Sequence, residues 1–297
     1  MACPPYPGPM IGLINVNKPA GPTSHDMVAR IRRLAPRRTK VGHAGTLDPF
    51  ATGVLVVCLG AATRLADYVA AGAKRYEAEI TFGATSTTDD PDGTLSETHR
   101  PPQSADGLRE ALAGFVGEIE QVPPSHSAVH VDGQRAYALA RADRPVNLPA
   151  RTVRVDAVEL LAFDGRRARL RIDCGKGTYI RSIARDLGVR LGCGAYCSAL
   201  RRTAVGPFTI DDAVDPDALT RETLADHLHP ARQAVAHLPA VALDAAALED
   251  VLHGRAVPCG DVAGEAAALD PTGRLVALGS AHRGRFQPSK VFPPDPA

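Results

Sequence analysis

The sequence of 297 residues contains 44% hydrophobic and 23% charged residues, which is ordinary for a soluble globular protein. This length allows a large core and favours two domains. No apolar run approaches the roughly 18 residues of a transmembrane helix, and the proline-rich residues 1–10 lack a signal-peptide pattern. We therefore expect a disordered leader, no membrane partner and a cytoplasmic location.

Charge is segregated along the chain, although the net charge is only +1. Residues 1–76 carry ten Lys/Arg against three Asp/Glu, and residues 121–210 carry fifteen against seven. Between these two basic blocks, residues 77–120 carry two Lys/Arg against ten Asp/Glu. If the basic blocks converge in the fold, their natural partner is a polyanion, but folding could also interleave them with acidic segments.

The N-terminal region predicts a strand, a capped helix and a basic cluster. Residues 12–16 are apolar and lead into a turn-rich loop, where Thr23 or Ser24 can cap the next helix. Six basic residues lie between positions 30 and 40. They form either a solvated charged face or a track for phosphates.

Residues 42–53 (GHAGTLDPFATG) are too rich in glycine, proline and threonine for a regular helix or strand, which predicts a shaped loop. The loop carries one carboxylate, Asp48, and one imidazole, His43. The apolar run at residues 54–59 is typical of a strand buried on both faces. An acid on a loop anchored in this way suits a rigidly presented reactive group. Alternatively, Asp48 is the N-cap of a helix with Pro49 at its first position.

The middle of the chain alternates between predicted strands and helices. Residues 62–71 and 108–119 have helical patterns, whereas residues 75–83, 151–161 and 167–174 alternate like half-buried strands. The basic residues 123–150 lack periodicity, which predicts an insertion that could close over a ligand. The aspartates of residues 83–93 lack the spacing of a calcium loop, and the six cysteines lack the spacing of a zinc site, so we expect reduced cysteines.

The second informative stretch is residues 175–188 (GKGTYIRSIARDLG), whose glycine spacing matches no phosphate-binding loop. Thr178 is expected to cap a helix, with Tyr179 and Arg181 projecting from its first turn. Arginine is unfavourable near a helix N-terminus, where the macrodipole favours anions. This placement predicts a specific partner for Arg181, and a buried carboxylate is one candidate.

Five short motifs follow one another along the chain. They are residues 18–24 (KPAGPTS), 42–53 (GHAGTLDPFATG), 74–78 (KRYEA), 177–181 (GTYIR) and 200–208 (LRRTAVGPF). Together they resemble the successive motifs of the bacterial tRNA pseudouridine synthase B (TruB) family. The resemblance implies that uridine is isomerised to pseudouridine at position 55 in the T-loop of tRNA, by base flipping and without a cofactor.

The resemblance implies that Asp48 is the catalytic residue and that Arg181 pairs with it. A pocket that excludes water raises the pKa of an aspartate, and a guanidinium at hydrogen-bond distance offsets this. Tyr76 is implied to stack on the flipped uracil, which recovers part of the unstacking cost. The sequence leaves open whether Asp48 attacks C6 or C1′ or removes the C2′ proton.

Four other residues receive roles through the resemblance. Tyr179 and Leu200 are implied to line the base pocket, and His43 to pack against the RNA where the target base has left its stack. Lys18 is implied to support the floor of the active site. No metal or organic cofactor is implied. The expected partner is the T-arm of tRNA, with no protein partner and a monomeric enzyme.

The resemblance also implies the pseudouridine synthase fold, an α+β fold in which helices flank a mixed, largely antiparallel central sheet. Residues 11–235 are expected to form the catalytic domain, and residues 238–297 a small β-rich domain resembling the PUA-type RNA-binding appendage of the family. Within the latter, residues 243–252 predict a helix, and residues 266–269 and 275–278 flank a turn like a hairpin.

Three other functions stay open at this stage. A non-catalytic tRNA-binding protein or folding chaperone would use the same basic surface without needing Asp48. A carboxylate hydrolase acting on a nucleoside or glycoside usually needs a paired acid, which the Asp48 loop lacks. A synthase of the same family acting on another RNA would share every motif.

Overall fold

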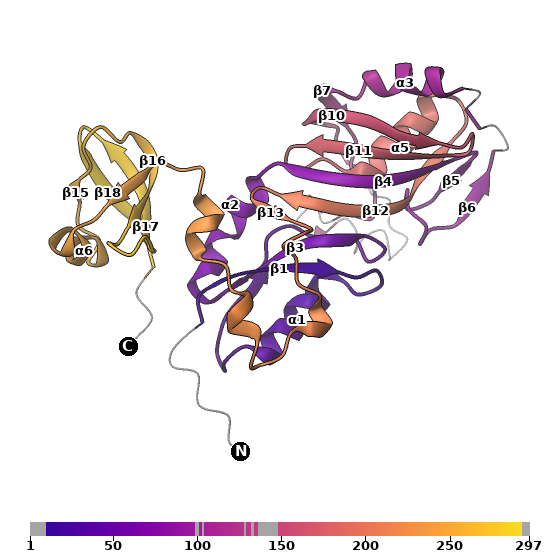
Figure 1. Ribbon diagram of the computed structural model, residues 1–297. Helices are drawn as coiled ribbons and strands as arrows, with labels where there is room; N and C mark the ends of the chain where they lie inside the picture. The colour runs from indigo at the N-terminus through magenta and orange to yellow at the C-terminus, as the bar shows by residue number, and fades with distance from the viewer. Residues whose placement is uncertain are drawn as a thin grey trace.

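The computed structural model describes residues 10–292, apart from 99–100, 103, 128, 132–133 and 136–147. Residues 1–9 of the predicted leader and much of the predicted insertion therefore lie outside the described residues. Two sheets dominate the described part of the chain (Figure 1). No helix within it is both long and apolar enough to cross a membrane.

The central sheet contains nine of the described strands: β1 (Gly12–Lys18), β2 (Val41–His43), β3 (Thr52–Leu59), β4 (Lys74–Phe82), β7 (Gly117–Gln121), β10 (Arg151–Phe163), β11 (Arg167–Cys174), β12 (Ala195–Val205) and β13 (Phe208–Thr209). Their order is β1-β3-β12-β4-β11-β10-β7, with β2 beside β3 and β13 beside β12. Only β3 and β12 pair in parallel among these strands. The predicted mixed, largely antiparallel sheet is confirmed.

Three helices pack on one face of this sheet: α1 (Ser24–Leu34), α3 (Ala105–Ala113) and α5 (Ile180–Arg190). Their apolar sides meet the inward residues of the strands in one core, which includes Ile31, Leu108 and Ile183. Thr23 caps α1, because its side chain and that of Asp26 each accept a hydrogen bond from the other residue's backbone N–H.

Strand β3 is buried on both faces because two different apolar clusters cover it. Leu55 and Val57 face the helices, whereas Val54 and Val56 face a second cluster. This second cluster includes residues of η1 (Gly60–Leu65), α2 (Ala66–Ala71) and η4 (Ala231–Val235). The buried strand is thus confirmed, and the helix predicted over residues 62–71 is a 3₁₀ turn followed by α2.

The structure shortens one predicted helix. Helix α3 ends at Ala113, and Ile119 of the helix predicted over residues 108–119 lies on β7, opposite Val153 of β10. Gly114 at the C-cap and Gly117, with φ +101°, end the helical conformation. Phe115 between them still packs in the core, so the apolar spacing continues beyond the helix.

The second sheet has the order β14-β16-β17-β18-β15 and is accompanied by helix α6. The bounds are β14 Ala240–Ala242, α6 Ala245–Leu252, β15 Val257–Pro258, β16 Gly264–Leu269, β17 Leu275–His282 and β18 Arg285–Val291. Antiparallel pairing of β16 with β17 confirms the predicted hairpin. The boundaries of the two domains and the likeness to a PUA domain stay predictions.

Shorter elements complete the described chain. They are the hairpin strands β5 (Ala84–Ser86) with β6 (Leu95–Glu97) and β8 (His130–Val131) with β9 (Gln134–Arg135), and the 3₁₀ turns η2 (Pro216–Ala218) and η3 (Leu224–His227).

The second sheet lies against the α2 side of the first (Figure 1). Leu278 and Phe292 share the second apolar cluster with Leu65 and Val69. The Arg64 guanidinium lies 5.2 Å from the centroid of the Phe292 ring. Helix α2 is therefore packed between the central sheet and the C-terminal sheet.

Gly53, at the start of β3, provides a test of how closely β3 packs against β12. Its φ is +101°, and a Cβ there would lie 2.2 Å from the carbonyl oxygen of Arg202 on β12. Gly21 has a similar φ of +100° but open space around it. We expect Gly53→Ala to lower the free energy of unfolding by about 1–3 kcal/mol more than Gly21→Ala does. Urea unfolding measures both losses, and equal losses would contradict the backbone clash.

Candidate active site

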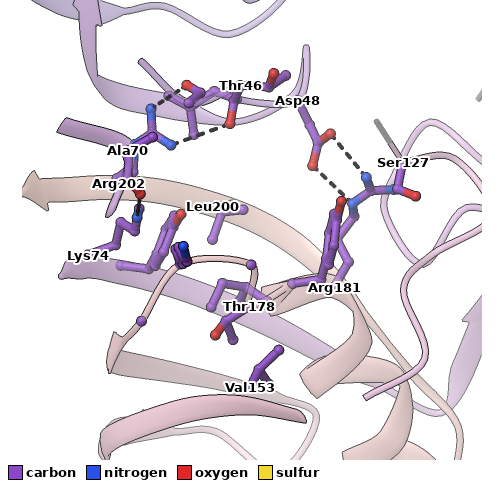
Figure 2. A pocket seen from close by; sticks show the side chains of 18 of the residues that line it. Thr46, Asp48, Ala70, Lys74, Ser127, Val153, Thr178, Arg181, Leu200 and Arg202 are labelled. Carbon is purple, nitrogen blue, oxygen red and sulfur yellow. Dashed lines mark hydrogen bonds and ion pairs between the residues drawn. The ribbon is translucent and has the colours of Figure 1, made fainter. Parts of the chain in front are cut away.

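A cavity of about 830 Å³ lies between the loop before β3, the end of α2 and the start of α5 (Figure 2). Its wall includes five of the seven predicted site residues: Asp48, Tyr76, Tyr179, Arg181 and Leu200. Pairing of β4 with β12 brings Tyr76 and Leu200 into one part of the wall, although 124 positions separate them in the sequence. The other two predicted residues, Lys18 and His43, do not line the cavity.

Arg181 holds the Asp48 carboxylate at the cavity wall. Arg181 Nη2 donates to Asp48 Oδ1 at 3.0 Å, and Nε lies 2.9 Å from Oδ2 (Figure 2). The Arg181 side chain is 3% exposed, whereas the Asp48 side chain is 30% exposed. The arginine is thus buried behind a carboxylate that faces the cavity. Arg181 has the predicted carboxylate partner, but the Asp48 side chain is only partly buried.

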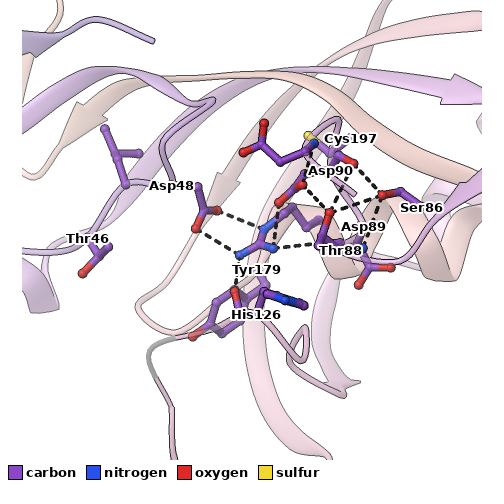
Figure 3. A network of polar contacts seen from close by, with 12 residues as sticks. Thr46, Asp48, Ser86, Thr88, Asp89, Asp90, His126, Tyr179 and Cys197 are labelled. Carbon is purple, nitrogen blue, oxygen red and sulfur yellow. Dashed lines mark hydrogen bonds and ion pairs between the residues drawn. The ribbon is translucent and has the colours of Figure 1, made fainter. Parts of the chain in front are cut away.

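A second carboxylate shares the same guanidinium. Arg181 Nη1 donates to Asp90 Oδ2 and to the carbonyl oxygen of Thr88, both at 2.9 Å (Figure 3). One turn further along α5, Arg185 Nη1 donates to Asp89 Oδ2 at 3.0 Å. Asp90 was not predicted from the sequence, where the acidic loop was compared only with a calcium site. The available signal was the pair of adjacent aspartates facing two arginines spaced i, i+4 on a helix.

The surroundings shift the pKa of Asp48 in opposing directions. Burial raises the pKa of this carboxyl above its ordinary value, the Arg181 guanidinium lowers it, and the Asp90 charge raises it. Lys18 adds a smaller lowering contribution. The raised pKa of Asp48 is therefore the result of burial and of a second carboxylate that competes for Arg181.

Buried side chains fix the carbonyl groups of the Asp48 loop. Lys18 Nζ donates to the carbonyl oxygens of Pro49 and Ala51 at 3.2 and 2.7 Å. Arg202, which is 2% exposed, donates to those of Gly45 and Val54 at 3.0 and 2.8 Å. Burial lowers the pKa of the Lys18 ammonium to about 8, and the Asp48 charge opposes this shift. Lys18 thus lies beneath the loop.

Two side chains in this support were not predicted from the sequence. Arg202 lies within the quoted motif at residues 200–208 but received no role of its own. The Ser24 hydroxyl contacts both backbone groups of Leu47, accepting from N–H at 2.8 Å and donating to the carbonyl at 3.0 Å. The contacts of Arg202 and of Ser24 join segments distant in sequence, so no local sequence pattern predicts them.

The structure corrects the helix-cap interpretation of Asp48. No helix begins at Pro49; instead, the N–H of Ala51 donates to the carbonyl oxygen of Asp48 at 3.1 Å and closes a turn. The loop then enters β3 at Thr52, because strand pairing with β1 and β12 claims the following residues. The Asp48 side chain is left free of a capping role and pairs with Arg181.

Thr178 does not cap α5. The N-cap residue is Tyr179, and the Thr178 hydroxyl donates to the carbonyl oxygen of Arg154 at 3.4 Å. The buried Gln121 side chain of β7 instead accepts from the N–H of Tyr179 at 2.7 Å and donates to its carbonyl at 3.0 Å. The start of α5 is therefore positioned by a neighbouring strand.

The two basic blocks converge on the cavity. Basic residues from both blocks line it: Lys74 from the first, and Arg151, Lys176, Arg181 and Arg202 from the second. Burial lowers the pKa of Lys74 to about 8. A cavity with this excess of positive groups suits an anionic ligand.

His43 lies on β2, opposite Val57 of β3, and is half-buried outside the cavity. Of the six basic residues between positions 30 and 40, Arg30 pairs with Asp217 at 2.7 Å, and Arg32 donates to the carbonyl oxygen of Val41. Arg33, Arg37, Arg38 and Lys40 are exposed. In the part of the chain that the structure describes, no group of three His, Cys, Asp or Glu side chains is placed to hold a metal ion.

Models of one protein family match most of the chain. A family model described as the N-terminal domain of TruB family pseudouridylate synthases matches residues 32–180. Two others, described as C-terminal domains of tRNA pseudouridylate synthase B and of tRNA pseudouridine synthase II, match residues 181–252 and 238–293. The chain belongs to the TruB family. It is therefore a pseudouridine synthase, which is an isomerase.

Individual TruB-family relatives are similar over nearly their whole length. The tRNA pseudouridine synthase B of Thermobifida fusca (strain YX) is 46% identical over 95% of this chain and 98% of its own. That of Mycobacterium sp. (strain KMS) is 46% identical over 90% and 91%. Among solved structures, a Cbf5-Nop10-Gar1 complex contains a chain that is 29% identical, with a TM-score of 0.73 over 99% of this chain and 92% of that chain.

The competition between two carboxylates for Arg181 can be measured directly. Asp90→Asn is expected to lower the pKa of the Asp48 carboxyl, because the substitution removes a negative charge that raises it. The carboxyl carbon shift of Asp48, followed by NMR over a pH titration, reports this pKa. Asp89→Asn is the matched control, since Asp89 pairs with Arg185. An unchanged or higher Asp48 pKa in Asp90→Asn would contradict the coupling.

Proposed function

We propose that this TruB-family enzyme isomerises uridine to pseudouridine at position 55 in the T-loop of tRNA, with Asp48 as the catalytic residue. The observation that carries the proposal is the Asp48 carboxylate, which faces the cavity and is paired with the buried Arg181. The name tRNA pseudouridine synthase B, which the Thermobifida fusca and Mycobacterium relatives carry, supports tRNA as the substrate.

The reaction exchanges one glycosidic bond for another. The N1–C1′ bond breaks, the uracil turns within the cavity, and a C5–C1′ bond forms. The proton on C5 is then lost, and N1 gains a proton, so atoms and charge balance. An ionised Asp48 can add to C6 or C1′, or remove the C2′ proton. Each of these routes needs the carboxylate deprotonated before the chemical step.

Arg181 favours the deprotonated form of the Asp48 carboxyl group in the largely desolvated cavity wall. Desolvation raises the Asp48 pKa, and the guanidinium opposes this shift while fixing both carboxylate oxygens. Because Arg181 also donates to the Thr88 carbonyl and to Asp90 Oδ2, rotating it away would break both hydrogen bonds and separate the buried Asp90 charge from its guanidinium. The carboxylate is thus oriented before the substrate arrives.

The cavity is open to a base that has left its stack. A nucleotide within a folded loop must flip out to reach Asp48, which costs a few kcal/mol. Stacking on Tyr76 would return roughly 1–3 kcal/mol. Tyr76 and Leu200 form one part of the wall, and the Arg151 guanidinium lies 4.9 Å from the Tyr179 ring centroid in another. We assign these side chains to the site that holds the planar uracil.

Binding of the RNA backbone is assigned to the basic groups around the cavity. Arg151 and Lys176 line it, and within the described part of the chain neither forms an ion pair with a carboxylate. The β-rich residues 238–297 are proposed to act as a PUA-like RNA-binding domain. Because phosphate contacts release counterions, affinity should fall as salt rises. The proposal requires no cofactor and no protein partner.

Asp48→Asn is expected to abolish pseudouridine formation in a T-arm hairpin while leaving RNA affinity within a few fold. The amide has nearly the shape of the carboxylate but cannot act as a nucleophile or base. Asp67→Asn is the matched control, since Asp67 is an exposed acid at the same cavity and is expected to remain active. Full activity of Asp48→Asn would refute the catalytic assignment.

The position of the modified nucleotide is tested in cells. Carbodiimide-based mapping of pseudouridine, with and without the gene, is expected to show loss of the signal at position 55 of tRNA only. A signal lost from another RNA would instead identify a synthase with a different substrate. An unchanged pseudouridine pattern would favour the tRNA-binding or chaperone alternative, and release of free uracil would favour hydrolysis.

A further inference from the structure

The hydroxyl of Ser127 is a buried polar group in the cavity wall that has no partner. Ser127 is 4% exposed, and its Oγ makes no hydrogen bond within the described part of the chain. The residue lines the cavity together with Asp48 and Arg181. A buried hydroxyl without a partner is unfavourable unless a ligand supplies one, so this group points to a contact made in the bound state.

The backbone before Ser127 is held firmly against α5. Arg181 Nη2 donates to the carbonyl oxygen of His126 at 2.8 Å. The side chains of Ser182 and Arg185 both donate to the carbonyl oxygen of Val122 at 2.9 Å. The same guanidinium that orients Asp48 therefore positions Ser127, and Figure 2 shows Ser127 on the Asp48 side of the cavity.

A second unsatisfied donor lines the cavity. Arg151 Nε is buried and has no hydrogen-bond partner among the residues described, although Nη2 of the same side chain donates to the Gly177 carbonyl at 2.8 Å. Ser127 lies near the start of the predicted insertion at residues 123–150, and Arg151 directly follows it. Arg151 Nε can only donate a hydrogen bond, and the Ser127 hydroxyl can donate or accept one, so a ligand that offers acceptor oxygens can satisfy both groups.

We propose that Ser127 is a substrate-binding residue whose hydroxyl donates a hydrogen bond to an oxygen of the flipped nucleotide. This assignment rests on the proposed function, which supplies a nucleotide as the ligand. A uridine offers acceptor oxygens on its base, at its 2′-hydroxyl and on its phosphate. The proximity of Ser127 to the Arg181–Asp48 pair places this hydrogen bond beside the reacting atoms.

Ser127→Ala tests the proposal through two measurements that a structural role would move together. We expect kcat/KM on a T-arm hairpin to fall about tenfold, because one hydrogen bond to the substrate is lost. The thermal unfolding midpoint should stay the same or rise, because the substitution removes an unsatisfied buried hydroxyl. Wild-type kcat/KM in this variant, or a midpoint that falls together with activity, would overturn the assignment.

Ser125→Ala is the matched control in the same segment. The Ser125 hydroxyl lies 3.2 Å from Nδ1 of His126, and Ser125 does not line the cavity. Its kcat/KM is expected to stay within about twofold of the wild-type value, which is less than the loss of a substrate hydrogen bond. A loss in Ser125→Ala equal to that in Ser127→Ala would show that the segment, and not the Ser127 hydroxyl, is responsible.

Modified substrates identify the oxygen that accepts the bond. Single-turnover rates of wild type and Ser127→Ala are compared on hairpins carrying 2-thiouridine, 4-thiouridine, 2′-deoxyuridine or a phosphorothioate at the target nucleotide. The modification that removes the difference between the two proteins marks the partner, whereas a difference that survives all four would overturn the proposal. Absence of pseudouridine with the wild-type chain would instead overturn the proposed function and this assignment with it.

Discussion

The Arg181 guanidinium joins three segments that are far apart in the sequence. It pairs with Asp48 on the loop before β3, with Asp90 on the acidic loop after β5, and with the carbonyl oxygen of His126. The Arg181 side chain is 3% exposed, and a buried guanidinium is stable only when acceptors such as these pair with it. Removing Arg181 would in turn leave the two carboxylates without their positive partner. The geometry of the cavity around Asp48 therefore depends on where α5 places this one side chain.

The position of α5 depends in turn on contacts outside the site. Gln121 of β7 binds both backbone groups of Tyr179, and Ile183 and Leu187 pack in the same core as the inward face of the central sheet. On the opposite side, Lys18 and Arg202 hold the carbonyl groups of the Asp48 loop. Helix α5 and the Asp48 loop are thus anchored separately and meet at the Arg181–Asp48 ion pair. The distances in this pair therefore depend on how the sheet positions both elements.

The C-terminal sheet contacts α2, a helix that lines the cavity. Tyr68 of this short helix donates to Glu265 of β16, and Val69 shares the second apolar cluster with Leu278 of β17. Asp67, Ala70 and Ala71 of the same helix line the cavity wall. The C-terminal domain, which is expected to bind RNA, therefore also supports the part of the cavity wall that α2 forms. Because α2 is a short rigid helix, a shift on the side facing this domain would also move the side facing the cavity.

The sequence by itself determined the elements and motifs whose signals are local. The glycine-rich loop, the strand buried on both faces, the alternation in β4 and the misplaced charge of Arg181 all follow from neighbouring residues and their periodicity. Local patterns predicted the wrong end for α3 and the wrong cap for α5, and they offered a helix-cap role for Asp48 as an alternative. At these three places, contacts with strands distant in the sequence overrode the local preference. Only the tertiary structure decided that Asp90 shares Arg181 and that the Ser127 hydroxyl is left unpaired in the cavity wall. Such facts depend on which distant side chains meet, and chain spacing does not encode distances between segments tens of residues apart.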